Sequence, residues 1–122
     1  MQLYRAMKKD HSLDKPKIGN SARELGVRVT GESLDIKLVK GNILPDDGGL
    51  SVSPESPENL PAHRRKKDPI WKIHSEILLN LGLQYIEDKP GKHGLIKPLR
   101  KMSLSEYEEA LFQTQQYWEL VE

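Results

Sequence analysis

The sequence predicts an α+β protein with mixed or antiparallel sheets, and three observations lead to this fold class. Several short segments alternate apolar and polar residues as strands do, a single segment has clear helical spacing, and the loops are long and polar. Because strands do not alternate regularly with long helices, a doubly wound parallel sheet is not expected. The 122 residues have the length of one domain, so a single domain over residues 1–122 is expected.

Composition excludes several classes of protein. The chain has no cysteine, which excludes disulfides, thiolate chemistry and cysteine-based metal sites. Its four histidines lack carboxylate partners at helical spacing, so we expect no metal site. The formal net charge is +1, and no segment approaches the ~18 apolar residues of a membrane span. Residues 1–10 also lack the apolar region of a signal peptide, so a cytoplasmic protein without a membrane partner is expected.

The first elements of the chain are predicted from alternation and turn residues. Residues 1–7 alternate as a strand. After a polar loop, a one-turn helix over residues 20–24 is expected, because Asn20 or Ser21 can cap it and Gly26 can end it.

A hairpin is predicted next. Residues 34–39 alternate as a strand, a turn covers 40–42, and residues 43–44 start the returning arm. The turn-forming sequence of residues 45–49 then leads into a new strand at 50–52.

The second half of the chain mixes a long loop with short regular elements. Residues 53–69 hold four prolines and are predicted to be an irregular, basic loop. A short helix over 75–81 is expected to end at Gly82, and strands are expected over 83–86 and 94–96.

The last element is predicted to be a helix. Ser103 and Glu106 have the spacing of a capping box. Six residues at helical spacing form one face, which we expect to pack on a sheet: Tyr107, Ala110, Leu111, Thr114, Trp118 and Val121.

Arg5 is the first candidate binding residue, because it lies in an otherwise apolar strand. A planar guanidinium suits the recognition of phosphate or ribose. An equally weighted alternative is a snorkelling residue at the edge of the sheet, or a residue that forms a salt bridge with Asp35 or Glu24.

Gly48 and Gly49 precede Ser51 at the start of a predicted strand. Glycines allow a close approach of the backbone to a ligand, although paired glycines are also common in turns before strands. Ser51 has no neighbouring nucleophile motif, so its hydroxyl is expected to hydrogen-bond a ligand or to support the strand.

His93 starts an apolar strand, where a histidine is either structural or placed to hydrogen-bond a ribose or transfer a proton. The basic run at residues 63–67 is interpreted as a solvated loop, with a phosphate or nucleic-acid contact as the less favoured reading.

Four short strings, in this order and spacing, resemble one family over nearly the whole chain. They are Leu3-Tyr4-Arg5-Ala6, then Leu25-Gly26-Val27 with Asp35-Ile36, then PDDGGLSV at 45–52, and HGLIKP at 93–98 before a helix with Trp118. The sequence is similar here to the ADP-ribosyltransferase-like toxins of bacterial type VI secretion effectors and their relatives.

This resemblance implies a fold, a substrate and a site. It implies two small mixed or antiparallel sheets around a cleft, with a C-terminal helix. NAD would be the substrate, bound by Arg5, Gly48, Gly49 and Ser51, and Ser51 and His93 would be the catalytic residues. A cognate immunity protein and a macromolecular target would be partners.

Three functions remain open on the sequence alone. The first is an NAD-dependent ADP-ribosyltransferase or NAD glycohydrolase. The second is a catalytically inactive protein-binding module of the same fold, which is favoured by Leu50 at a position where the family has threonine. The third is a nucleic-acid-binding protein that uses residues 63–67, and the salt dependence of binding would identify it.

Overall fold

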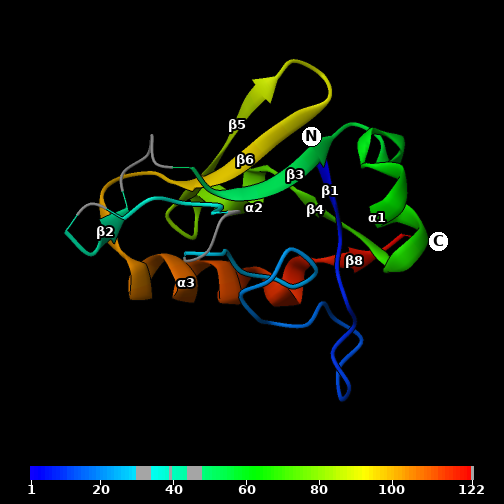
Figure 1. The fold of residues 1–122 in the computed structure, drawn as a ribbon, viewed down its shortest axis with the longest axis horizontal. Coiled ribbons are helices and arrows are strands. Elements are labelled where there is room, and N and C mark those ends of the chain that lie inside the picture. The colour runs from blue at the N-terminus through cyan, green and yellow to red at the C-terminus, as the bar shows by residue number, and fades with distance from the viewer. Residues whose placement is uncertain (30–33, 39, 44–47, 122) are drawn as a thin grey trace.

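A computed structural model of the chain describes residues 1–29, 34–38, 40–43 and 48–121, and it confirms the α+β class (Figure 1). Six strands form one antiparallel sheet in the order β5-β6-β3-β1-β4-β8. Their bounds are β1 Gln2–Ala6, β3 Leu50–Pro54, β4 Ile70–His74, β5 Leu83–Lys89, β6 His93–Pro98 and β8 Glu119–Leu120. A second small sheet pairs β2 (Asn42–Ile43) with β7 (Met102–Ser103).

Helices cover the sheet and one of its ends. α3 (Leu104–Gln113) runs beneath the sheet in Figure 1, and α1 (Ala62–Lys67) lies beside the end of β3. The short helix α2 is Glu76–Leu79, and two 3₁₀ turns, η1 (Pro57–Asn59) and η2 (Thr114–Tyr117), flank the longer helices. The strands predicted at 1–7, 50–52, 83–86 and 94–96 and the helix predicted at 75–81 are confirmed, with shifted ends.

The C-terminal helix is confirmed together with its capping box. The Ser103 hydroxyl accepts from the Glu106 amide at 3.1 Å, and the Glu106 carboxylate accepts from the Ser103 amide at 3.2 Å. These bonds satisfy two of the backbone donors that a helix start leaves free. The predicted apolar face is buried from Tyr107 to Trp118, although the α-helix itself ends at Gln113 and continues as η2.

The prediction of a helix over residues 20–24 is wrong, because the backbone there bonds to a neighbouring segment. The Leu25 amide donates to the Lys17 carbonyl at 2.8 Å, and Ile18 forms an isolated parallel bridge with Leu25. The segment therefore consists of turns held against residues 17–19.

The hairpin predicted over 34–44 is also wrong where the structure describes it. Ile36 forms only an isolated bridge, with Gly48, and β2 pairs with β7 instead of a preceding strand. The predicted positions 39 and 44–47 lie outside the described residues.

The prediction of an irregular loop over residues 53–69 is only partly correct. The prolines stand at the boundaries of regular elements rather than inside them: Pro54 ends β3, Pro57 starts η1, Pro61 precedes α1 and Pro69 precedes β4. A proline is compatible with the first turn of a helix because no helical hydrogen bond uses its nitrogen. The basic run is consequently most of a helix.

The six-stranded sheet is joined at its middle by a narrow contact. β1 and β3 share only two register pairs, Leu3 with Pro54 and Tyr4 with Ser53, whereas β1 pairs with β4 along its whole length. Beyond Tyr4 the ladder to β3 stops, and Figure 1 shows the two strands diverging from their point of contact. The sheet therefore opens next to Arg5.

Candidate functional site

A pocket of about 200 Å³ lies at the opening between β1 and β3. Its polar lining residues come from five parts of the chain: Arg5, Arg28, Asp35, Ser51, Ser53, Arg64 and His93. Its apolar lining consists of Ala6, Ala22, Val52, Leu60 and Pro61. Three arginines and one carboxylate give this pocket a positive charge.

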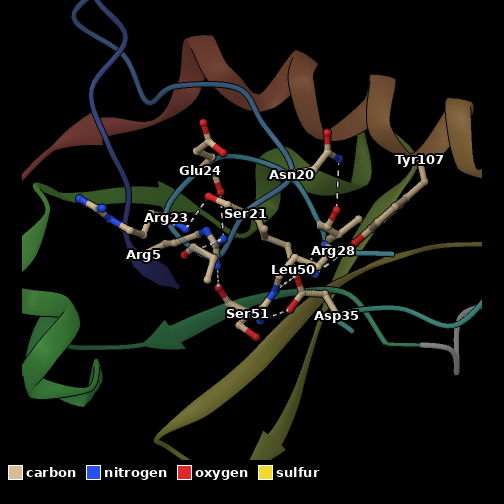
Figure 2. A network of polar contacts seen from close by, with 12 residues as sticks. Arg5, Asn20, Ser21, Arg23, Glu24, Arg28, Asp35, Leu50, Ser51 and Tyr107 are labelled. Atoms are coloured by element: carbon tan, nitrogen blue, oxygen red, sulfur yellow. Dashed lines mark hydrogen bonds and ion pairs between the residues drawn. The ribbon is translucent and has the colours of Figure 1, made fainter. Parts of the chain in front are cut away.

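Arg5 is held by backbone carbonyls on both sides of the opening (Figure 2). One terminal nitrogen donates to the Ser51 carbonyl at 2.8 Å, and the other donates to the Glu24 carbonyl at 2.9 Å and, more weakly, to the Ala22 carbonyl at 3.4 Å. The side chain thus replaces the missing ladder bonds between β1 and β3. The alternative of a salt bridge from Arg5 to Asp35 or Glu24 is wrong, since these contacts are with main-chain oxygens. The alternative of a snorkelling edge residue is also wrong, because Arg5 is buried and β1 has a strand on each side.

The Arg5 charge is buried without a counter-charge in contact. The residue is 7% exposed, and no carboxylate of the described residues lies within ion-pair distance of it. Burial, with the nearby charges of Arg64 and Arg28, lowers the pKa of Arg5 to about 10, although Asp35 partly opposes the shift. Its Nε atom is buried with no hydrogen-bond partner among the described residues. Arg5 remains a cation at neutral pH, so an anion entering the pocket would remove an unfavourable burial of charge.

An ion pair fixes the loop that carries the carbonyls of Ala22 and Glu24. Arg23 donates from Nε to one oxygen of Asp68 at 2.8 Å and from a terminal nitrogen to the other at 2.7 Å. The Asp68 carboxyl is almost fully buried at the end of α1, and the hydrogen bond from Arg23 lowers its pKa. This two-pronged geometry ties one wall of the pocket to α1.

A second ion pair forms another wall. Asp35 accepts from the Arg28 backbone amide at 2.7 Å, from its Nε at 3.1 Å and from a terminal nitrogen at 2.9 Å (Figure 2). These bonds raise the pKa of Arg28 and occupy the carboxylate of Asp35. Asp35 is therefore engaged before any ligand binds.

Ser51 lies on the pocket side of β3, and Leu50 on the opposite side. The Ser51 side chain is half-buried, lines the pocket and makes no hydrogen bond with the described residues. Leu50 is 1% exposed and belongs to the hydrophobic core. Because side chains alternate across a strand, leucine at position 50 takes no hydroxyl from the pocket.

Gly48 and Gly49 allow close approaches within the chain itself. A Cβ on Gly48 would lie 2.2 Å from the Asp35 carbonyl oxygen, and one on Gly49 would lie 2.4 Å from that of Ile96. Gly48 also has a φ of +99°, which favours glycine. Neither glycine lines the pocket, so each shapes the start of β3 against neighbouring backbone.

His93 lines the far side of the pocket at the start of β6. Its Nδ1 lies 2.6 Å from an oxygen of Asp88, on the other strand of the hairpin. Burial raises the pKa of Asp88, but the contact with His93, a backbone hydrogen bond and the charge of Lys89 together outweigh it, and the net shift of the pKa is downward. With Nδ1 occupied, Nε2 is the nitrogen left for a ligand.

The structure therefore brings together Arg5, Ser51 and His93, which are three of the five residues predicted for the site. Sequence reasoning missed the contributions of Arg28 and Arg64 to the pocket and that of Asp88 behind His93. Only the contact between Asp88 and His93 had a local signal, because both residues lie between the neighbouring strands predicted over 83–86 and 94–96.

No protein-family model, curated protein or solved structure matches this chain. Within the described residues, no group of three metal-binding side chains is suited to hold an ion, and no helix is long and apolar enough to cross a membrane.

Proposed function

We propose that this chain binds NAD in the pocket between β1 and β3 and acts as an NAD-dependent ADP-ribosyltransferase or NAD glycohydrolase. The observation that carries the proposal is the convergence of Arg5, Ser51 and His93, from three different strands, on one positively charged pocket. The narrow junction of the sheet also supports an ADP-ribosyltransferase-like fold, in which two small sheets border a cleft.

The charge of the pocket suits a diphosphate. Arg5 is buried without a counter-charge in contact, and Arg64 extends from α1 to the same pocket. Guanidinium groups bind phosphate oxygens with paired hydrogen bonds, which are stronger than neutral ones. At about 200 Å³ the pocket is smaller than the roughly 300–1,000 Å³ of drug-sized ligand sites. We therefore expect it to enclose part of the dinucleotide, with the remainder extending toward α1.

The reaction would break the bond between the ribose C1′ and the nicotinamide nitrogen. Nicotinamide leaves with the bonding electron pair, and C1′ passes through a cationic state before water or an acceptor adds to it. The attacking group then loses a proton, for which the free Nε2 of His93 is the candidate acceptor. The Ser51 hydroxyl would hold the ribose, and the arginines would fix the phosphates, so that binding energy positions the reacting carbon.

A second candidate is a binding module that keeps the pocket but does not catalyse. Asp35 is the one carboxylate among the described residues that line the pocket, and Arg28 already occupies both of its oxygens. Within the described part of the chain, no free carboxylate is thus placed to stabilise the ribose cation. Such a module would act through protein contacts, with an immunity protein or another macromolecule as partner.

Nicotinamide release from NAD tests the enzyme proposal. We expect Ser51→Ala and His93→Gln to lower the rate, the histidine change on the order of 100-fold. Ser105→Ala and His11→Gln are matched controls, because both side chains are exposed and neither lines the pocket. Saturable NAD binding without turnover would favour the binding module, and no binding at all would contradict both.

A further inference from the structure

The basic run of the sequence forms a compact cationic surface. α1 carries Arg64, Arg65, Lys66 and Lys67 on consecutive positions, and His63 precedes them. Arg64 is half-buried and lines the pocket, whereas the other four side chains are exposed. We call His63–Lys67 the α1 basic surface.

The charges of this surface are not compensated locally. None of its four cations forms an ion pair with a described residue. Asp68, the acidic residue next in sequence, is occupied by Arg23 and is almost fully buried. The carboxylates of Glu55 and Glu58 precede the surface in sequence and are exposed, and neither forms an ion pair with a described residue of α1.

The net charge of the chain is near zero, but its acidic and basic residues are concentrated on different helices. Acidic residues gather on α3, where Glu106, Glu108 and Glu109 lie within one turn. Figure 1 shows α3 running beneath the sheet and α1 apart from it, beside the end of β3. A polyanion would therefore be attracted to one side of the molecule, even though the whole chain carries +1.

A helix C-terminus by itself favours one or two basic residues, because they interact with its carbonyls. All four residues of the last turn of α1 are basic, which is more than the interaction with its carbonyls requires. The ion pair of Arg23 with Asp68 also anchors the C-terminal end of α1, so the position of the helix that carries the cations is fixed.

An aromatic residue of β1, Tyr4, lies on the same face of that strand as the pocket residue Ala6. Tyr4 is half-buried, and strand alternation places it on the face of Ala6, which lines the pocket beside Arg64. Its register partners are Ser53, another pocket residue, and Lys72. A cationic helix next to a partly exposed aromatic ring is typical of proteins that bind single strands, because phosphates contact the charges and bases stack on the ring.

We propose that the α1 basic surface and Tyr4 bind a single-stranded nucleic acid, with its phosphates on α1 and a base against Tyr4. This binding is additional to the proposed use of NAD and does not depend on it. It would place the strand at the mouth of the pocket.

Binding of a fluorescent single-stranded oligonucleotide, measured by anisotropy without NAD over a series of salt concentrations, tests the proposal. The variant R65Q/K66Q/K67Q removes three exposed charges. The control K37Q/R100Q/K101Q removes the same number and kinds of charge at exposed positions outside α1. We expect the α1 variant to lose at least about tenfold in affinity. The slope of log K against log salt concentration should decrease in magnitude by about 2, because each lost phosphate contact removes about 0.7 from it. The control should bind as the wild type does.

Tyr4→Leu separates base stacking from simple charge attraction. We expect it to weaken binding of the single strand about tenfold while leaving the salt dependence unchanged, with thermal unfolding confirming that the variant is folded. The proposal is overturned if the wild type does not bind the oligonucleotide saturably, or if the α1 variant and the control weaken equally. Tighter binding of a duplex than of the single strand would also overturn it.

Discussion

Residues 8–41 and residues 50–120 differ in their secondary structure and in the contacts that hold them in place. The second region consists of strands and helices whose side chains alternate or repeat, and it supplies most of the core. In the first region, the described residues contain no helix and no strand. Besides backbone hydrogen bonds and a few buried apolar side chains, polar side chains hold this region, through the contacts of Arg5 with Glu24, Arg23 with Asp68, and Arg28 with Asp35.

Because of this difference, most of the stability of the fold and the closure of the pocket depend on different regions of the chain. The regular region provides a scaffold, whereas the irregular region closes the pocket with charged groups that are already satisfied by each other. If this view is correct, substitutions in the polar network should change both the pocket and the stability. Substitutions in the scaffold should change stability alone.

The largest effect is expected at Arg5, which joins both regions. Arg5→Met leaves the carbonyls of Ser51 and Glu24 without a donor, while it removes the cost of a buried charge. We expect a net loss of about 3 kcal/mol in the free energy of unfolding, measured in urea. An unchanged or increased stability would show that Arg5 does not hold the two regions together.

Tyr107→Phe tests the scaffold by itself. The Tyr107 hydroxyl donates to the Ile96 carbonyl at 2.5 Å and accepts from the Leu50 amide at 3.2 Å, and the side chain is fully buried. Burial raises the pKa of this phenol, so the hydroxyl keeps its proton. Phenylalanine should cost about 2 kcal/mol, because two buried backbone groups lose their partner.

The matching readout for Tyr107→Phe is NAD affinity, which we expect to stay at the wild-type value. A parallel loss of NAD binding would mean that the scaffold and the site are not separable.

Asp68→Asn should have an intermediate effect that depends on pH. The hydrogen bond from Arg23 depresses the pKa of Asp68 in the folded chain. The ionised pair therefore stabilises the fold above the ordinary pKa of 3.8, and this contribution is lost as the pH falls through the lower, folded value. We expect a loss of about 1.5 kcal/mol at neutral pH and a smaller difference from wild type below pH 3.8. Urea denaturation at both pH values checks this, and a difference independent of pH would contradict it.

The smallest effect is expected at the helix cap. Ser103→Ala removes the hydroxyl that accepts from the Glu106 amide, which should cost about 1 kcal/mol. Ser105→Ala, at an exposed position in the first turn of α3, is the matched control and should be nearly neutral. Equal effects of the two changes would show that the capping box does not stabilise α3.

The two regions also differ in how well the sequence predicted them. The strands β3, β5 and β6 and the cap of α3 follow from alternation, turn residues and the spacing of Ser103 and Glu106, which are local signals. The predicted helix at 20–24, and the predicted strand at 34–39 where the structure describes it, failed because the backbone there bonds to neighbouring irregular segments, at Lys17 and Arg28, which neither helical spacing nor alternation reveals.

The site residues that the sequence predicted also have local signals, and those it missed, apart from Asp88, do not. Arg5, Ser51 and His93 stood out as polar residues in apolar strands, and the pocket brings them together. Arg28, Arg64 and Asp88 reach the site through loop pairing and the position of α1. The glycines at 48 and 49 were recognised as points of close approach, but their neighbour is the backbone of the chain itself.

The affinity for NAD, measured by calorimetry, tests the central claim most directly when two neighbouring arginines are compared. Arg64 lines the pocket, whereas Arg65 follows it on α1 and is exposed. We predict that Arg64→Gln weakens NAD binding about tenfold, the loss of one charge-assisted hydrogen bond, and that Arg65→Gln leaves it unchanged. Equal affinities of the two variants, or no saturable binding by the wild type, would contradict the account.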